Sequence, residues 1–196
     1  MARHFSLAEI VGRMTTAEDD HYFAETPMTI FTDAEFAALI AERKQLPVNW
    51  RNRLKLLPRD GTSFLQRSFE IQGDGGHTFK VFMRKNLEWI EDFSIGLMLV
   101  APDGEYVLTR YNGSSHKHTN HLEREAGNQE HSFRDRCHIH VSTERYQRRR
   151  GKEEGYAAAT TAYASFETAI EAFFSANGFV KPPDAYTQPD LFAEEP

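Results

Sequence analysis

The chain has 196 residues, a net charge of −6, 40% hydrophobic residues and 27% charged residues, which is ordinary for a soluble globular protein. No apolar run approaches the roughly 20 residues that span a bilayer, so we expect no membrane partner. The first residues contain no continuous apolar segment of the kind found in signal peptides, and the single Cys137 excludes an internal disulfide. We therefore expect a cytoplasmic protein.

The first half of the chain has one helical pattern followed by strand-like patterns. Residues 1–31 are weakly patterned and are predicted to be weakly structured. Thr32 and Glu35 have the spacing of a capping box, which predicts a helix from residue 32 that ends at Pro47. Alternating or continuous apolar residues, separated in part by turn sequences, then predict strands over 51–57, 63–72, 77–84, 93–100 and 105–111.

The second half is predicted to contain a long loop, one more strand over 136–142 and a closing helix. Apolar residues at three- and four-residue spacing predict a long helix over 153–177, with Gly178 at its C-terminal cap. Together these elements predict a single α+β domain over 32–180. Its antiparallel sheet of about five or six strands is packed by the long C-terminal helix and the shorter N-terminal helix. Residues 181–196, rich in proline and acidic residues, are predicted to form a disordered tail.

Six of the nine histidines lie between His116 and His140. Because alternate residues of a strand share a face, His138 and His140 are predicted to point the same way, together with Ser142. Cys137, Ile139 and Val141 would point to the other face, which looks like core. Imidazole is both the side chain that titrates near neutral pH and the commonest metal ligand, so this segment is the candidate site.

Three interpretations of the histidines stay open. In the first they are general acids and bases that cleave a phosphodiester, with His138, His140, His118 and His116 catalytic and with Arg110, Arg145 and Arg148 binding phosphate. In the second, zinc or another divalent metal is bound by a set drawn from His138, His140, His118 and His121, leaving one position for water. In the third they are structural.

A basic run lies next to the histidines. Residues 134–152 contain seven Lys or Arg against two acidic residues, a local charge of +5 in an acidic chain. Such a run favours an anionic ligand such as nucleic acid. The alternative is a solvated loop, with residues 148–152 forming a turn.

Two resemblances add to these observations. The tail sequence QPDLF, with Gln188, Asp190, Leu191 and Phe192, resembles the peptide by which bacterial proteins dock on the DNA polymerase sliding clamp. The resemblance implies a bacterial, phage or mobile-element protein that acts at replicating or repaired DNA. The blocks RYNG, HKHTN and HIH resemble an uncharacterised bacterial family, which implies no function.

The sequence therefore supports three functional hypotheses. The first is a clamp-tethered nuclease or phosphodiesterase with the histidines in its site. The second is a non-catalytic toxin or inhibitor that blocks the sliding clamp through the tail. The third is a zinc-binding structural or regulatory module.

Overall fold

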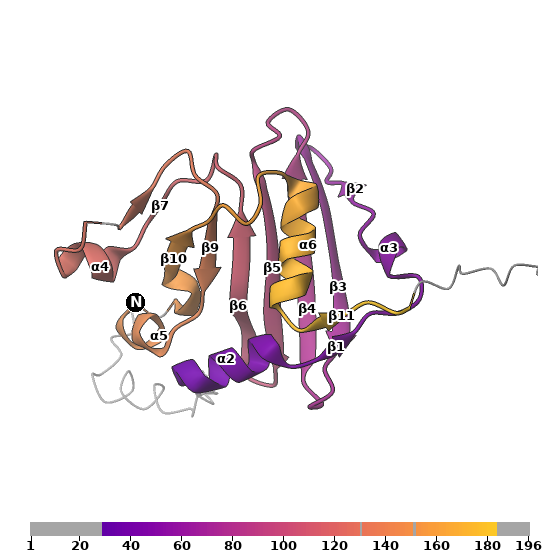
Figure 1. Cartoon of the computed structure of the whole chain (residues 1–196), viewed down its shortest axis with the longest axis horizontal. Helices are drawn as coiled ribbons and strands as arrows, with labels where there is room; N and C mark the ends of the chain where they lie inside the picture. Colours follow the sequence, from indigo (N-terminus) through magenta and orange to yellow (C-terminus); the bar gives the residue numbers. More distant parts are fainter. Residues whose placement is uncertain (1–28, 130, 151, 184–196) are drawn as a thin grey trace, which may run out of the picture.

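The computed structural model describes residues 29–129, 131–150 and 152–183. Within these ranges the chain is an α+β protein built on a seven-stranded sheet in which every neighbouring pair is antiparallel (Figure 1). The strand order is β10-β9-β6-β5-β4-β3-β2. The expected fold class is confirmed, and the sheet is larger than the five or six strands predicted.

The sheet strands are β2 (Leu57–Pro58), β3 (Phe64–Gln72), β4 (Thr78–Asn86), β5 (Phe93–Ala101), β6 (Gly104–Asn112), β9 (His138–Val141) and β10 (Tyr156–Ala159). Two short pairs lie outside it: parallel β1 (Lys44–Gln45) with β11 (Phe179–Val180), and antiparallel β7 (His118–Thr119) with β8 (Ser132–Phe133). The helices are α2 (Asp33–Ala41), α3 (Trp50–Arg53), α4 (His121–Glu125), α5 (Glu144–Arg150) and α6 (Phe166–Ala176), with a 3₁₀ turn η1 at Glu153–Gly155.

One face of the sheet carries the hydrophobic core. Phe79, Val81 and Met83 of β4 alternate onto this face and are at most 2% exposed, and α6 packs over them with Phe166, Ala169, Phe173 and Phe174. Figure 1 shows α6 lying along the central strands and α2 crossing the end of β6. Among the described elements, no helix of this length lies over the opposite face of the sheet. That face carries the polar side chains that alternation turns away from the core.

The helix predicted over 153–177 is wrong in its first half. The chain instead forms η1 and the strand β10, whose backbone pairs with β9 (Tyr156 with Val141, Ala159 with His138). The helix begins only after Ser165, which forms a capping box with Thr168. The apolar spacing upstream of that cap coincided with a helical period, and pairing to β9 overrides it.

Two further boundaries differ from prediction. The expected strand over 51–57 is a helical turn, α3, followed by the short β2, because Trp50 is buried edge-on against Phe174 at 5.7 Å between ring centroids. The first helix has the predicted capping box but ends at Ala41 and not at Pro47. The buried Lys44 ammonium donates hydrogen bonds to the carbonyls of Leu39 and Ile40, which would otherwise accept from the next helical turn.

Candidate functional site

The strand histidines lie where β9 pairs with β6. His138 is opposite Asn112 and His140 is opposite Arg110, so these four side chains share the face of the sheet that points away from α6. Alternation therefore places His138 and His140 together as predicted. The face is not open at this point, however: His138 and His140 are 0% and 1% exposed.

A glycine turn brings a third histidine to this pair. After β6 the chain turns at Gly113, whose amide donates to Phe93 O, and a Cβ at this position would lie 1.9 Å from Glu91 O. The close approach therefore requires glycine. The turn at Gly113 directs His116 back over the sheet, where His116 Nδ1 lies 3.1 Å from His138 Nε2.

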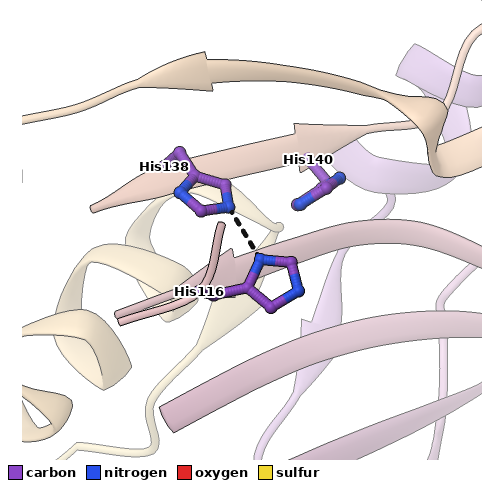
Figure 2. A group of neighbouring side chains, drawn as sticks. All are labelled: His116, His138 and His140. Carbon is purple, nitrogen blue, oxygen red and sulfur yellow. Dashed lines mark hydrogen bonds between the residues drawn. The ribbon is translucent and has the colours of Figure 1, made fainter. Parts of the chain in front are cut away.

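His116, His138 and His140 form a trio in which one ring nitrogen from each residue lies within 4.8 Å of the others (Figure 2). His138 Nδ1 donates to Arg136 O at 3.0 Å and His140 Nδ1 donates to Glu154 O at 2.9 Å. Since carbonyls only accept, both rings carry their proton on Nδ1, and each Nε2 has a lone pair. His140 Nε2 is buried and has no hydrogen-bond partner. This is the arrangement found in metal-binding histidines, whose second nitrogen is held by a carbonyl.

Burial lowers the pKa of all three histidines. The pKa of His116 falls to about 4 and that of His140 to about 2, and the pKa of His138 is also lowered. The positive charge of Arg110 adds to desolvation in each case. The imidazoles are therefore neutral near pH 7, with lone pairs to offer and no extra proton to give.

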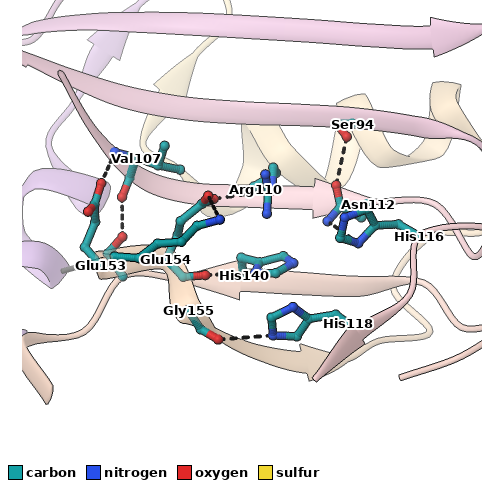
Figure 3. A network of polar contacts seen from close by, with 12 residues as sticks. Ser94, Val107, Arg110, Asn112, His116, His118, His140, Glu153, Glu154 and Gly155 are labelled. Carbon is teal, nitrogen blue, oxygen red and sulfur yellow. Dashed lines mark hydrogen bonds and ion pairs between the residues drawn. The ribbon is translucent and has the colours of Figure 1, made fainter. Parts of the chain in front are cut away.

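The other candidate histidines have different positions. His118 packs edge-to-face against His140, with the ring centroids 4.3 Å apart. Its Nε2, however, donates to Asn120 Oδ1 at 2.9 Å and to Gly155 O at 3.1 Å, and Figure 3 shows the bond to Gly155. His118 thus supports the trio from behind. His121 is exposed at the start of α4 and contacts Arg124. The structure does not bring His121 to the trio.

Of the three candidate phosphate-binding arginines, only Arg110 lies beside the trio. Its Nε is 3.3 Å from Oε2 of Glu154, a buried carboxylate, although neither atom has hydrogen-bond geometry (Figure 3). Arg145 and Arg148 lie on α5 and form ion pairs with Glu123 and Glu144. Residues 144–150 of the basic run therefore form a helix in which these two arginines have acidic partners, and the alternative of a turn starting at residue 148 is wrong for residues 148–150.

The groove beside the trio was not predicted. It has a volume of about 810 Å³ on the same face of the sheet, and His116 lines one part of it. Arg84, Ser94, Asn112 and Glu154 belong to this region and were missed as candidates. The strand register could have pointed to three of them, because Arg84 is opposite Ser94, which is opposite Asn112, which is opposite His138. Glu154 lies in η1, outside this register.

No family model matches the chain, and neither a curated protein nor a solved structure matches it. Among the described residues, no helix is long and apolar enough to cross a membrane. The tail residues Gln188, Asp190, Leu191 and Phe192 lie outside the described residues.

Proposed function

We propose that this protein is a divalent-metal-dependent phosphodiesterase, with His116, His138 and His140 as the metal ligands. The observation that carries the proposal is the convergence of three ring nitrogens, two from the buried His138 and His140 and one from the partly exposed His116. If His116 donated its Nδ1 proton to His138 Nε2, His140 Nε2 would still be a buried polar atom without a partner. A cation at the centre takes the lone pair of one nitrogen from each ring, including the otherwise unpartnered His140 Nε2.

The trio supports metal chemistry over imidazole acid–base catalysis. A general acid needs a proton on the nitrogen that faces the substrate, but His138 and His140 hold theirs on Nδ1 against backbone carbonyls. Three imidazoles and an open position match catalytic zinc, and imidazole also suits iron, nickel and copper. Such a metal lowers the pKa of bound water to about 7 and supplies a hydroxide.

Arg110 and the groove favour a phosphodiester as the substrate. With a metal held by the three histidines, its hydroxide would attack phosphorus, the bond to the leaving oxygen would break, and that oxygen would take a proton from water. Arg110 is one strand away from His140 and offers its guanidinium to the phosphate oxygens. Glu154 is 5% exposed and pairs with Arg110. Its negative charge would offset the repulsion between Arg110 and a divalent cation held by the trio. Among the described residues that line the groove there is no carboxylate.

The proposal is tested by metal content and activity measured together. The purified wild type should contain one metal ion per chain and hydrolyse bis(p-nitrophenyl) phosphate, with loss of activity in EDTA and recovery on adding zinc or manganese. His140→Ala should lose the metal and at least about 100-fold in activity, since even outer-shell changes at metal sites cost about 10–100-fold.

The matched control is His131→Ala, since His131 lies outside the trio and bonds Asn128 O. It should keep both metal and activity. A metal-free wild type, or a His140→Ala variant as active as the wild type, contradicts the proposal. Stoichiometric metal without hydrolysis of any phosphodiester would instead favour the structural zinc module.

We also propose that the tail docks the enzyme on the bacterial sliding clamp in the cytoplasm, which would raise its effective concentration at DNA. The support is the sequence around Gln188, Asp190, Leu191 and Phe192. Replacing Leu191 and Phe192 by alanine should abolish clamp binding in calorimetry while phosphodiesterase activity is kept. Equal binding of this variant and the wild type contradicts docking. If only the tail variant, and not His140→Ala, loses the effect of the protein in cells, the clamp-blocking toxin or inhibitor is favoured.

A further inference from the structure

The groove beside the trio has features that phosphodiester hydrolysis alone does not require. It lies over the exposed parts of β3 to β6, where alternation brings Lys80, Phe82 and Arg84 of β4 to the face that carries the trio. Two rows of paired residues cross this face. One contains Arg84, Ser94, Asn112 and His138, and the next contains Ser68, Phe82, Gly96, Arg110 and His140.

Unused polar atoms mark the same face. Five buried side-chain nitrogen or oxygen atoms have no hydrogen-bond partner in the described part of the chain: Arg67 Nε, Arg84 Nε, Arg110 Nε, His140 Nε2 and Glu154 Oε2. Arg67, Arg84 and Arg110 line the groove, and His140 and Glu154 lie beside Arg110. The buried Nε donors of these arginines are unused and point to an absent acceptor, and phosphate oxygens have the matching geometry.

Phe82 gives the groove an apolar platform between these cations. A Cβ at Gly96 would lie 2.1 Å from Phe82 Cζ, so the ring lies across the neighbouring strand where only glycine leaves room. The ring remains half-buried. Arg84 is held in place from one side by the Phe64 ring, 4.6 Å from its Cζ, and from another by Asp92 at 3.6 Å.

We propose that the groove binds single-stranded nucleic acid laid across the strands, with a base stacked on Phe82 and phosphates held by Arg84 and Arg110. This inference rests on the proposed phosphodiesterase and names its substrate class. From Ser68 to His140 the row crosses four inter-strand steps of about 4.8 Å, or about 19 Å, which is longer than one nucleotide. If one base of the nucleic acid stacks on Phe82, a phosphate of a following nucleotide therefore reaches the trio.

A single strand fits this surface better than a duplex. Base stacking on an aromatic ring requires an open base face, which a duplex hides, and a basic groove with an aromatic platform is the usual means of binding single strands without sequence preference. Next to the Phe82 ring, the groove is lined by the small polar side chain of Ser68 and by the amide of Gln66, both on β3. The Lys80 ammonium, paired with Glu105 at 2.9 Å, lies at the outer part of the groove.

The test is binding of fluorescent twelve-residue dT and U oligonucleotides to the full-length protein in EDTA, which prevents cleavage. Phe82→Ala should weaken binding about 5- to 100-fold, and Phe82→Trp should restore it, because it keeps a stacking ring. Arg84→Gln should weaken binding and lower the slope of log K against log salt by about one, since one phosphate contact is lost. The control Arg43→Gln, on a surface ion pair with Asp74, should bind as the wild type does.

Three outcomes would overturn the inference: no binding of either oligonucleotide at low salt, unchanged affinity in Phe82→Ala, or equal affinity for duplex DNA or polyglutamate. The comparison of dT with U assigns DNA or RNA as the better ligand. Because binding is measured without metal, failure here leaves the metal content and phosphodiesterase tests untouched, and their failure leaves this measurement valid.

Discussion

Asn120 is the residue that ties the histidine-bearing loop to the sheet. Its amide forms a reciprocal pair with Ala157, donating Nδ2 to the carbonyl and accepting from the amide, both at 2.8 Å. The same Oδ1 accepts from His118 Nε2. Asn120 is 1% exposed, so no water replaces it without rearrangement. The support of the trio thus depends on one buried amide.

We expect Asn120→Ala to lower the free energy of unfolding by about 2–4 kcal/mol, since it leaves two buried backbone groups without partners. Asn120→Asp keeps the acceptor and loses the donor, so its loss should be smaller. Urea unfolding followed by circular dichroism measures both. Equal stability of Asn120→Ala and the wild type would show that this tether is not needed.

Strand alternation was enough to predict that His138 and His140 share a face. It could not predict that His116 joins them, because the path of the loop depends on the approach of Gly113 to Glu91, about 22 residues earlier in the chain. The sequence also did not predict that His138 and His140 are buried. Their polar face of the sheet is covered by other parts of the chain, and such long-range packing is not encoded in the periodicity of the sequence.

Among the elements, α2 and α6 end at the same place, and Lys44 joins them. Its buried ammonium donates to Glu42 O at 2.7 Å and also contacts the carbonyls of Leu39, Ile40 and Asn177. One side chain therefore serves the C-terminal ends of both helices, where cations are favoured by the helix dipole. The parallel pair of β1 and β11 follows directly from this junction.

Lys44→Met keeps the length of the side chain and removes its donors. We expect it to lower the free energy of unfolding by about 2–4 kcal/mol, because buried carbonyls lose their charged partner. Lys55→Met, at an exposed position, should change stability by less than about 0.5 kcal/mol. Thermal and urea unfolding of the two variants give the comparison, and similar losses in both would argue against the junction.

The elements that were predicted well are those whose signal is local. The capping box at Thr32 and the hairpin over 73–76 form as expected, because their hydrogen bonds lie within a few residues. The helix prediction was wrong over residues 153–165 because this segment contains strand β10, which depends on pairing with β9. Local spacing cannot report a backbone pairing of this kind.

At the scale of the whole molecule, the sheet separates stability from the proposed chemistry. One face is buried by α6 (Figure 1), and the other carries the trio, Arg110 and the groove. Figure 3 shows Arg110 beside His140 on this second face. The α+β class and the antiparallel sheet followed from alternating strands and short turns. The position of the groove next to the trio did not follow from the sequence, because it depends on the register of five strands, β3 to β6 and β9.

X-ray absorption at the metal edge of the purified, zinc-loaded protein examines the trio directly. We expect one zinc per chain with three imidazole nitrogens and one oxygen at about 2.0–2.1 Å. In His140→Ala this pattern should be lost, while His131→Ala should give the wild-type spectrum. A wild type that binds no stoichiometric metal, or that binds it through sulfur at about 2.3 Å, would contradict the metal site formed by His116, His138 and His140.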